Sequence, residues 1–148
     1  MQNIELNNFK NIIALPIGIS DHNAIERFGV LSDDIGHSGS QIGPEINDSY
    51  LIPVCTIDSL DEFDVPDHLK IDIDGLELDV IYGMANILMS GAMDSCLIEI
   101  NDNKERILKL FEGFGYTTDN RFNKLANHSR VRRKKEGINA ENVIFTRK

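Results

Sequence analysis

Several carboxylates surround one glycine in the most apolar part of this chain. Within residues 69–83, LKIDIDGLELDVIYG, the acids flank Gly75 and are Asp72, Asp74, Glu77 and Asp79. A buried carboxylate without a partner costs several kcal/mol or becomes protonated, so the arrangement needs a physical reason. Carboxylates in such a place can make a turn, cap a helix, hold a cation, or orient a reacting hydroxyl and take its proton.

The elements that must position these acids alternate between strand and helix. Residues 69–73 predict a strand, and apolar residues at helical spacing predict a helix over residues 76–90 that Gly91 closes in the left-handed region. A second strand is predicted at 95–100. A second helix follows and ends near Gly113 or Gly115, with Asp102 and Glu105 at a capping-box-like spacing. This order implies right-handed crossovers, so the predicted fold class is α/β, with a mostly parallel sheet and helices on its faces.

The flanking segments contribute further strands. Residues 12–17 are predicted as a core strand of the parallel sheet, although Pro16 marks an irregular point in it. Residues 25–32 and 50–58 can pair as antiparallel strands across the polar, glycine-rich loop at 33–48, and a terminal strand is predicted at 142–146.

In an open parallel sheet, ligands bind beyond the carboxyl ends of the strands. Asp72 lies where one strand ends and a helix begins, and Glu99 lies at the end of the next strand. The pattern therefore predicts that these two residues share one rim with Glu77, Ser20 and Asp21. Other interpretations stay open: Asp74 is the natural turn residue before Gly75. Glu77 and Asp79 suit a solvated first helical turn, where the helix dipole favours carboxylates, and for Glu77 a side chain that reaches back toward the strand end also stays open. A structural role for Glu99 would require a partner such as Lys70.

Composition limits the class of protein. The chain has 148 residues, of which 41% are hydrophobic, which suits one domain with its own core. Its net charge of -9 argues against non-specific binding to nucleic acid by the domain as a whole. The charge is uneven, because residues 104–148 hold twelve basic and five acidic residues. The basic run HSRVRRKKEG, 128–137, is expected to be a solvated loop, or else a clamp for an anionic acceptor.

Other motifs are absent or weak. Cys55 and Cys96 lie in apolar surroundings without CxxC spacing, which fits a reducing cytoplasm. The sequence has no stretch long enough to span a membrane, and its four histidines lack the spacing of metal ligands, so no metal site is predicted. It contains no GxGxxG and no P-loop. The DID triplet alone mimics the DxD clasp of metal-dependent glycosyltransferases.

LKIDIDGLELDVIYGM, preceded by VCTIDSL and followed by SCLIEI and FEGFGY, resembles the C-terminal half of FkbM-type methyltransferases. The similarity runs from about Leu6 to Tyr116. It implies a partial Rossmann-like class I methyltransferase fold and an enzyme that transfers a methyl group from S-adenosylmethionine, mostly to oxygen on natural products or sugars. The resemblance makes residues 1–148 one such domain, with 119–148 as its basic C-terminal segment, and a small molecule its acceptor.

The resemblance also assigns residues. Ser20 and Asp21 correspond to the strand end on the adenine side of the cofactor. The motif at residues 70–77 corresponds to the family's fourth strand and the helix start after it, which lie next to the methyl donor and acceptor. Within this motif, the resemblance assigns Lys70, Asp74 and Gly75 to cofactor binding. Asp72, Glu77 and Glu99 are the expected catalytic residues.

In that family the glycine-rich cofactor loop and the ribose-binding acid precede the LNN segment that begins at Leu6. The chain is therefore expected to be a truncated or split copy that binds the cofactor weakly alone, and to be completed by an upstream half-domain or a homo-oligomer. Two other functions stay open: a DxD-type glycosyltransferase, and a non-catalytic interaction module with exposed apolar surface.

Overall fold

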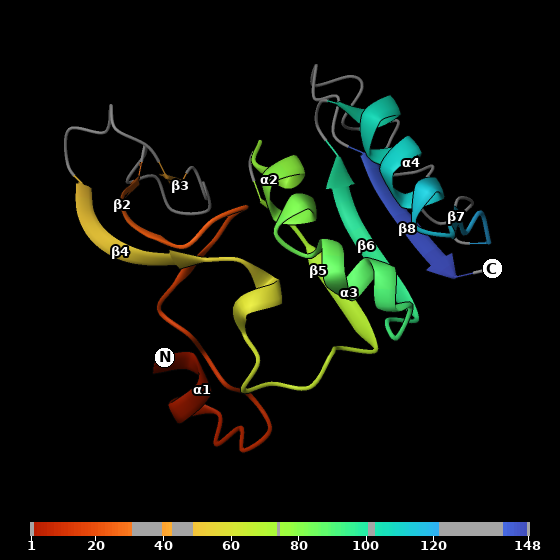
Figure 1. Cartoon of the computed structure of the whole chain (residues 1–148). Helices are drawn as coiled ribbons and strands as arrows, with labels where there is room; N and C mark the ends of the chain where they lie inside the picture. The colour runs from red at the N-terminus through yellow and green to blue at the C-terminus, as the bar shows by residue number, and fades with distance from the viewer. Residues whose placement is uncertain are drawn as a thin grey trace, which may run out of the picture.

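The computed structural model of the whole chain contains two four-stranded sheets (Figure 1). It describes residues 2–30, 40–42, 49–73, 75–100, 103–121 and 141–147. The first sheet has the strand order β1 (Gly18–Ile19), β4 (Ser49–Cys55), β2 (Ala24–Val30), β3 (Ser40–Ile42). The second has the order β5 (His68–Ile71), β6 (Ser95–Ile100), β8 (Glu141–Arg147), β7 (Tyr116–Thr118). The helices are α1 (Gln2–Leu6), the 3-10 helix η1 (Ile57–Ser59), α2 (Glu77–Tyr82), α3 (Ala85–Ser90) and α4 (Lys104–Gly113).

The chain is a mixed α/β protein, and the prediction of a mostly parallel sheet is wrong. Strand β5 pairs with β6 in parallel, as predicted, and β1 pairs with β4 in parallel. The pairs β2–β3, β2–β4, β6–β8 and β7–β8 are antiparallel. A parallel pair needs a crossover of a dozen or more residues. The α2–α3 segment provides one between β5 and β6, whereas the four residues between β1 and β2 only reverse the chain.

The predicted core strand at 12–17 does not form. These residues are extended and outside any strand, residues 12–16 are exposed, and only Gly18–Ile19 pairs, in a different sheet from β5. Pro16 has no backbone N–H to donate to a neighbouring strand, which explains an interruption at that one position. It does not explain why none of residues 12–17 pairs; residues 2–17 are called the N-terminal arm below. Within the predicted loop at 33–48, residues 40–42 form β3 instead. The antiparallel pairing of β2 with β4 and the terminal strand β8 are confirmed.

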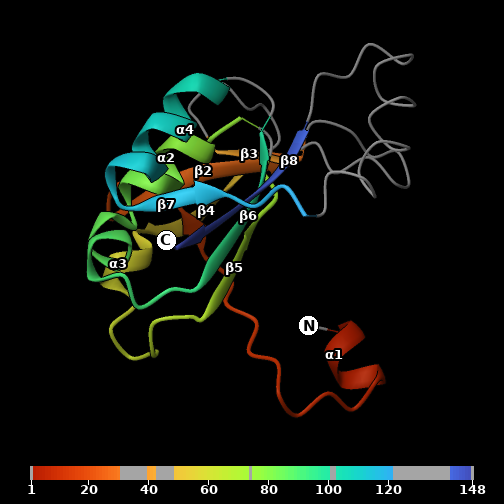
Figure 2. The same cartoon turned by 90° about the vertical axis from the view of Figure 1, so that its right-hand side faces the viewer.

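The core lies between the second sheet and three helices that cover one face of it (Figure 2). Alternate residues of β6, namely Cys96, Ile98 and Ile100, are buried, as expected of a strand with one face on a core. From α4, Phe111 stacks on Phe145 of β8 with ring centroids 4.0 Å apart. The backbone pairing of β5 with β6, in which Ile71 lies opposite Ile98, brings the carboxyl ends of these two strands together.

The helix predicted over 76–90 is two helices, because the chain breaks at Gly83 and Met84. Gly91 closes α3 in the left-handed region, with φ 65°, as predicted. Asp102, the predicted capping residue of α4, lies outside the described residues, and Asn103 occupies the cap position. In the described part of the chain, no helix has the length and apolarity to cross a membrane.

Candidate functional site

The register of β5 and β6 places two of the predicted carboxylates side by side. Ile71, the last residue of β5, pairs with Ile98, so Asp72 follows directly beside Glu99 of β6. Lys70 Nζ donates to Asp72 Oδ2 over 2.5 Å. The Asp72 side chain is 47% exposed, so it is not the buried carboxylate that its apolar neighbours suggest. Its charge is stabilised by water and by the Lys70 ammonium.

The turn after β5 is held by a glutamate from the following helix. The backbone N–H of Gly75 donates to Glu77 Oε1 over 3.1 Å. Glu77 is only 3% exposed, so the interpretation of it as a solvated first-turn residue is wrong. The reason is that its carboxylate reaches back to the turn instead of out to water. Asp74 lies outside the described residues.

Gly75 gives this turn an open surface. Its φ of 95° lies in the region that side-chain-bearing residues rarely adopt, which explains the glycine. Apart from its chain neighbours, no atom of the residues that the structure describes lies within 4 Å of the position that a Cβ would occupy there. A ligand can therefore approach the backbone of the turn closely, beside the strand ends of Asp72 and Glu99.

Ser20 and Asp21 lie at the other end of α2. Ser20 is buried; its amide donates to Cys55 O over 3.0 Å and its hydroxyl to Asp21 Oδ1 over 3.4 Å. A Cβ at Gly83, which follows α2, would lie 2.1 Å from Ser20 O, so the two backbones touch. The six residues of α2 span about 9 Å and separate this contact from the Gly75 turn. The candidate residues thus form two groups, one at each end of α2.

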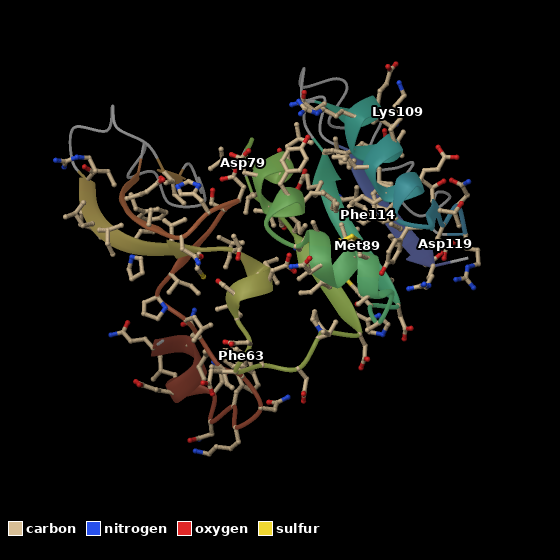
Figure 3. All side chains as sticks on the ribbon, viewed as in Figure 1. Phe63, Asp79, Met89, Lys109, Phe114 and Asp119 are labelled. Carbon is tan, nitrogen blue, oxygen red and sulfur yellow. The ribbon has the colours of Figure 1, made fainter. Side chains whose placement is uncertain are left out.

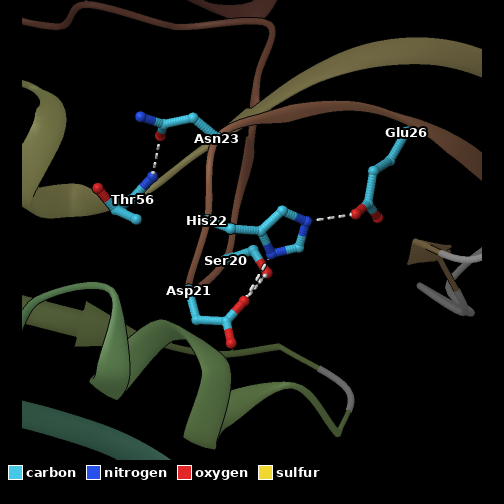
Figure 4. Close-up of polar contacts among 6 residues, drawn as sticks. All are labelled: Ser20, Asp21, His22, Asn23, Glu26 and Thr56. Carbon is cyan, nitrogen blue, oxygen red and sulfur yellow. Dashed lines mark hydrogen bonds and ion pairs between the residues drawn. The ribbon is translucent and has the colours of Figure 1, made fainter.

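A histidine that was not predicted to belong to the site, His22, joins the second group (Figure 4). His22 Nδ1 lies 2.6 Å from Asp21 Oδ1, and Nε2 lies 2.7 Å from Glu26 Oε1. Hydrogen bonds to the Asp21 and Glu26 carboxylates raise the pKa of the His22 imidazole, and the His22 hydrogen bond lowers the pKa of Asp21. The adjacency of Asp21 and His22, with Glu26 four residues on, was the only signal in the sequence.

Asp58 joins the first sheet to the helices. Its carboxylate accepts the amides of Asn86 and Ile87 over 2.9 and 3.1 Å, at the start of α3. Its own amide donates to Gly83 O over 2.9 Å. Residues 56–58, TID, belong to the VCTIDSL segment quoted above for the family resemblance. They have a structural role, because Asp58 fixes the break between α2 and α3 against which Ser20 packs.

Of the other predicted features, Asp79 is half-buried in α2. The basic run at 128–137 lies outside the described residues. Among the residues that the structure describes, no three His, Cys, Asp or Glu side chains form a group that could hold a metal ion.

Comparison with known proteins gives one match. The model of the methyltransferase FkbM domain family matches residues 1–128. No curated protein and no solved structure matches the chain significantly.

Proposed function

The chain belongs to the FkbM methyltransferase domain family, and from this premise we propose that it transfers the methyl group of S-adenosylmethionine to an oxygen of a small-molecule or sugar acceptor. We also propose that the unit from β5 through α2 and α3 to β6 is part of a Rossmann-like class I fold. The two free cysteines, Cys55 and Cys96, favour a reducing compartment such as the cytoplasm.

The observation that carries the proposal is the edge where β5 and β6 end together. It brings Asp72 beside Glu99, next to a turn whose backbone is open at Gly75. The donor set suits the proposed cofactor, because that molecule carries a positive sulfonium, which carboxylates stabilise. When bound, the cofactor would supply an electrophilic methyl group, and its sulfur would leave as a neutral thioether as the bond from the methyl to the acceptor oxygen forms. The open turn leaves room for a ligand against the backbone.

Each residue then has a role that follows from its contacts. Methyl transfer is an in-line displacement, so the protein has above all to align the two reactants. Asp72 orients the acceptor hydroxyl and takes its proton as the oxygen becomes alkylated. The Lys70 ammonium holds the Asp72 carboxylate in one direction. Buried Glu77 fixes the Gly75 turn, and Glu99 adds a second carboxylate at the strand ends.

The group at the far end of α2 suits a binding role. Ser20 and Asp21 present a hydroxyl and a carboxylate that can accept hydrogen bonds, as the adenine side of the cofactor requires. We assign them, with Lys70, Asp74 and Gly75, to cofactor binding. The backbone contact at Gly83 sets the distance between this group and the turn at Gly75.

We also propose that the domain associates with a partner. Strand β5 pairs only with β6 among the described residues, so one edge of it can accept a further strand from an upstream half-domain or from a second copy. Exposed apolar side chains on the N-terminal arm, at Leu6, Phe9 and Ile12, favour such an association. A non-catalytic interaction module is accordingly the second candidate function.

The test combines binding and transfer. We expect calorimetry to detect at most weak S-adenosylmethionine binding by the chain alone, and clear binding when the upstream half-domain or second copy proposed above is supplied. In that form, labelled cofactor should methylate a hydroxyl-bearing acceptor in a panel of sugars and natural products. The Asp72→Asn variant should lower turnover at least 100-fold and change cofactor affinity little, because Asp72 acts on the acceptor. Asp67→Asn, which removes an exposed acid at the opposite end of β5, is the matched control and should behave like the parent chain.

Two results would contradict parts of this proposal. Unchanged turnover in Asp72→Asn would move the catalytic role to Glu77 or Glu99. Concentration-dependent self-association with neither cofactor binding nor transfer would favour the interaction module.

A further inference from the structure

A second site lies away from the strand ends. A cavity of about 630 Å³ opens between the N-terminal arm, the segment around η1 and its following loop, and α3. Its volume is within the usual range of about 300–1,000 Å³ for small-molecule sites. None of the predicted site residues lines it. It is therefore separate from the proposed methyl-transfer site.

The cavity walls are apolar and come from three parts of the chain. The arm contributes Ile13 and Leu15, the loop after η1 contributes Phe63 and Val65, and α3 contributes Ile87. Figure 3 shows Phe63 where that loop passes the N-terminal arm. Ile13 is 72% exposed and Phe63 44% exposed, so the walls keep large apolar surfaces in contact with water. A ligand that covers them gains hydrophobic free energy.

The polar groups of the cavity carry one sign of charge. Three carboxylates line it, those of Asp58, Asp61 and Asp64, and its lining residues include no Lys, Arg or His within the described chain. Both oxygens of Asp58 already accept the α3 amides. Asp61 and Asp64 are exposed, flank the aromatic Phe63 in the sequence, and line the same cavity as that ring. Two carboxylates beside an aromatic ring suit a cationic group.

We propose that this cavity binds a small organic cation, an amine or guanidinium on an apolar body. The apolar body lies against the walls from the arm and α3, and the cation lies between Asp61 and Asp64. Charge complementarity selects this occupant over a second copy of the chain, because two copies of this acidic rim repel each other. Its size favours a small molecule over a polypeptide.

Matched probes test the charge requirement. Titration of the full chain with 4-phenylbutylamine, 4-phenylbutanol and 4-phenylbutyrate, followed by amide chemical shifts, compares one apolar body with three head groups. We expect saturable shifts confined to 11–15, 57–66 and 86–90. The amine should bind at least ten-fold more tightly than the carboxylate, with the alcohol between them. High salt should reduce the difference.

Matched variants locate the charge. Each of Asp61→Asn and Asp64→Asn should weaken amine binding about two- to five-fold, and the double variant should bind the amine and the alcohol alike. Glu62→Gln removes an acid from the same exposed loop that does not line the cavity, and should leave binding unchanged. All these side chains are exposed, so the spectra of the variants should show the parent fold.

Three results would overturn the proposal. They are equal affinity for the amine and the carboxylate, shifts scattered over the surface, and an Asp61 and Asp64 double variant that binds like the parent. A fourth result, dimers in sedimentation together with concentration-dependent amide shifts at the same residues without any probe, would replace the small cation with self-association. Cofactor binding and methyl transfer depend on different residues, so failure here leaves the proposed function standing.

Discussion

Replacing Gly83 by alanine should push apart the two backbones that meet at the end of α2. The added Cβ would lie 2.1 Å from Ser20 O and 3.1 Å from the Ser20 carbonyl carbon. Because real Cβ atoms essentially never come closer than 3.0 Å and ordinary contact begins at 3.4 Å, one backbone has to move by roughly 1 Å. Neither atom is the free end of a side chain, so no rotamer change relieves the overlap.

The sign of the effect follows from two opposing terms. Gly83 has a φ of -70°, so alanine fits its backbone and gains up to about 1 kcal/mol of helix propensity. Overpacking against a fixed backbone costs about 1–3 kcal/mol. The overlap also strains the hydrogen bond from the Asp58 amide to the Gly83 carbonyl. We therefore expect Gly83→Ala to lower the free energy of unfolding by about 1–2 kcal/mol.

Gly113→Ala is the matched control, since Gly113 ends α4 and, outside its own helix, no atom of the described part of the chain lies within 4 Å of its Cβ position. This variant should be neutral or slightly stabilising. Urea unfolding followed by far-UV circular dichroism measures both, because the chain has no tryptophan to report by fluorescence. Equal unfolding free energies for the two variants would refute the reasoning from the Ser20 contact. Amide shifts at Ser20 and Asp21 should move in Gly83→Ala only.

Three further predictions concern single side chains. Asp58→Ala should cost about 1 kcal/mol in urea unfolding, because two α3 amides lose their acceptor; an unchanged midpoint would remove the capping role. Burial raises the pKa of the Cys96 thiol from 9.0 to about 12, so iodoacetamide should modify it about 1,000-fold more slowly than an ordinary thiol, and mass spectrometry should find Cys55 alkylated first. The ion pair of His22 and Asp21 should stabilise the fold most between pH 3.8 and 6.5. Because the pKa of His22 is raised in the fold, its contribution to stability is lost as pH rises through the folded pKa. Because the pKa of Asp21 is lowered, its contribution is lost as pH falls through the folded pKa. The difference in urea midpoint between the parent and His22→Ala should therefore shrink both above and below this pH window.

Local sequence patterns predicted the strands and helices that pack together in the core of the second sheet. The apolar run at 69–73 and the alternation in 95–100 gave β5 and β6, because each strand presents its buried face to α2, α3 and α4. Gly91 marked the end of a helix because its conformation is unfavourable for other residues. Phe111 belonged to a recognisable apolar helix face.

Most of the features that the sequence did not predict depend on contacts between residues far apart in the chain. The run at 12–17 has the composition of a strand, but a strand exists only where a neighbour offers its backbone, and the described residues offer none there. Glu77 is an exception, because the contact that goes with its burial is local: its carboxylate accepts the amide of Gly75, two residues earlier in the sequence. The break at Gly83 required knowledge of Ser20, more than 60 residues away in sequence.

The same contacts explain why the two groups of candidate residues depend on each other. Asp58 holds the start of α3 and the Gly83 carbonyl, and the backbone of Ser20 packs against Gly83, so the end of α2 is fixed by distant segments. Its start is fixed locally, by the bond between Glu77 and the Gly75 amide in the turn after β5. A helix of six residues has little stability alone, and these contacts with the core keep it in place. The distance between the Asp72 edge and the Ser20 group is therefore set by α2. A change at either end that lets α2 shift should alter cofactor binding and acceptor alignment together, whereas loss of the Asp72 carboxylate should alter only alignment.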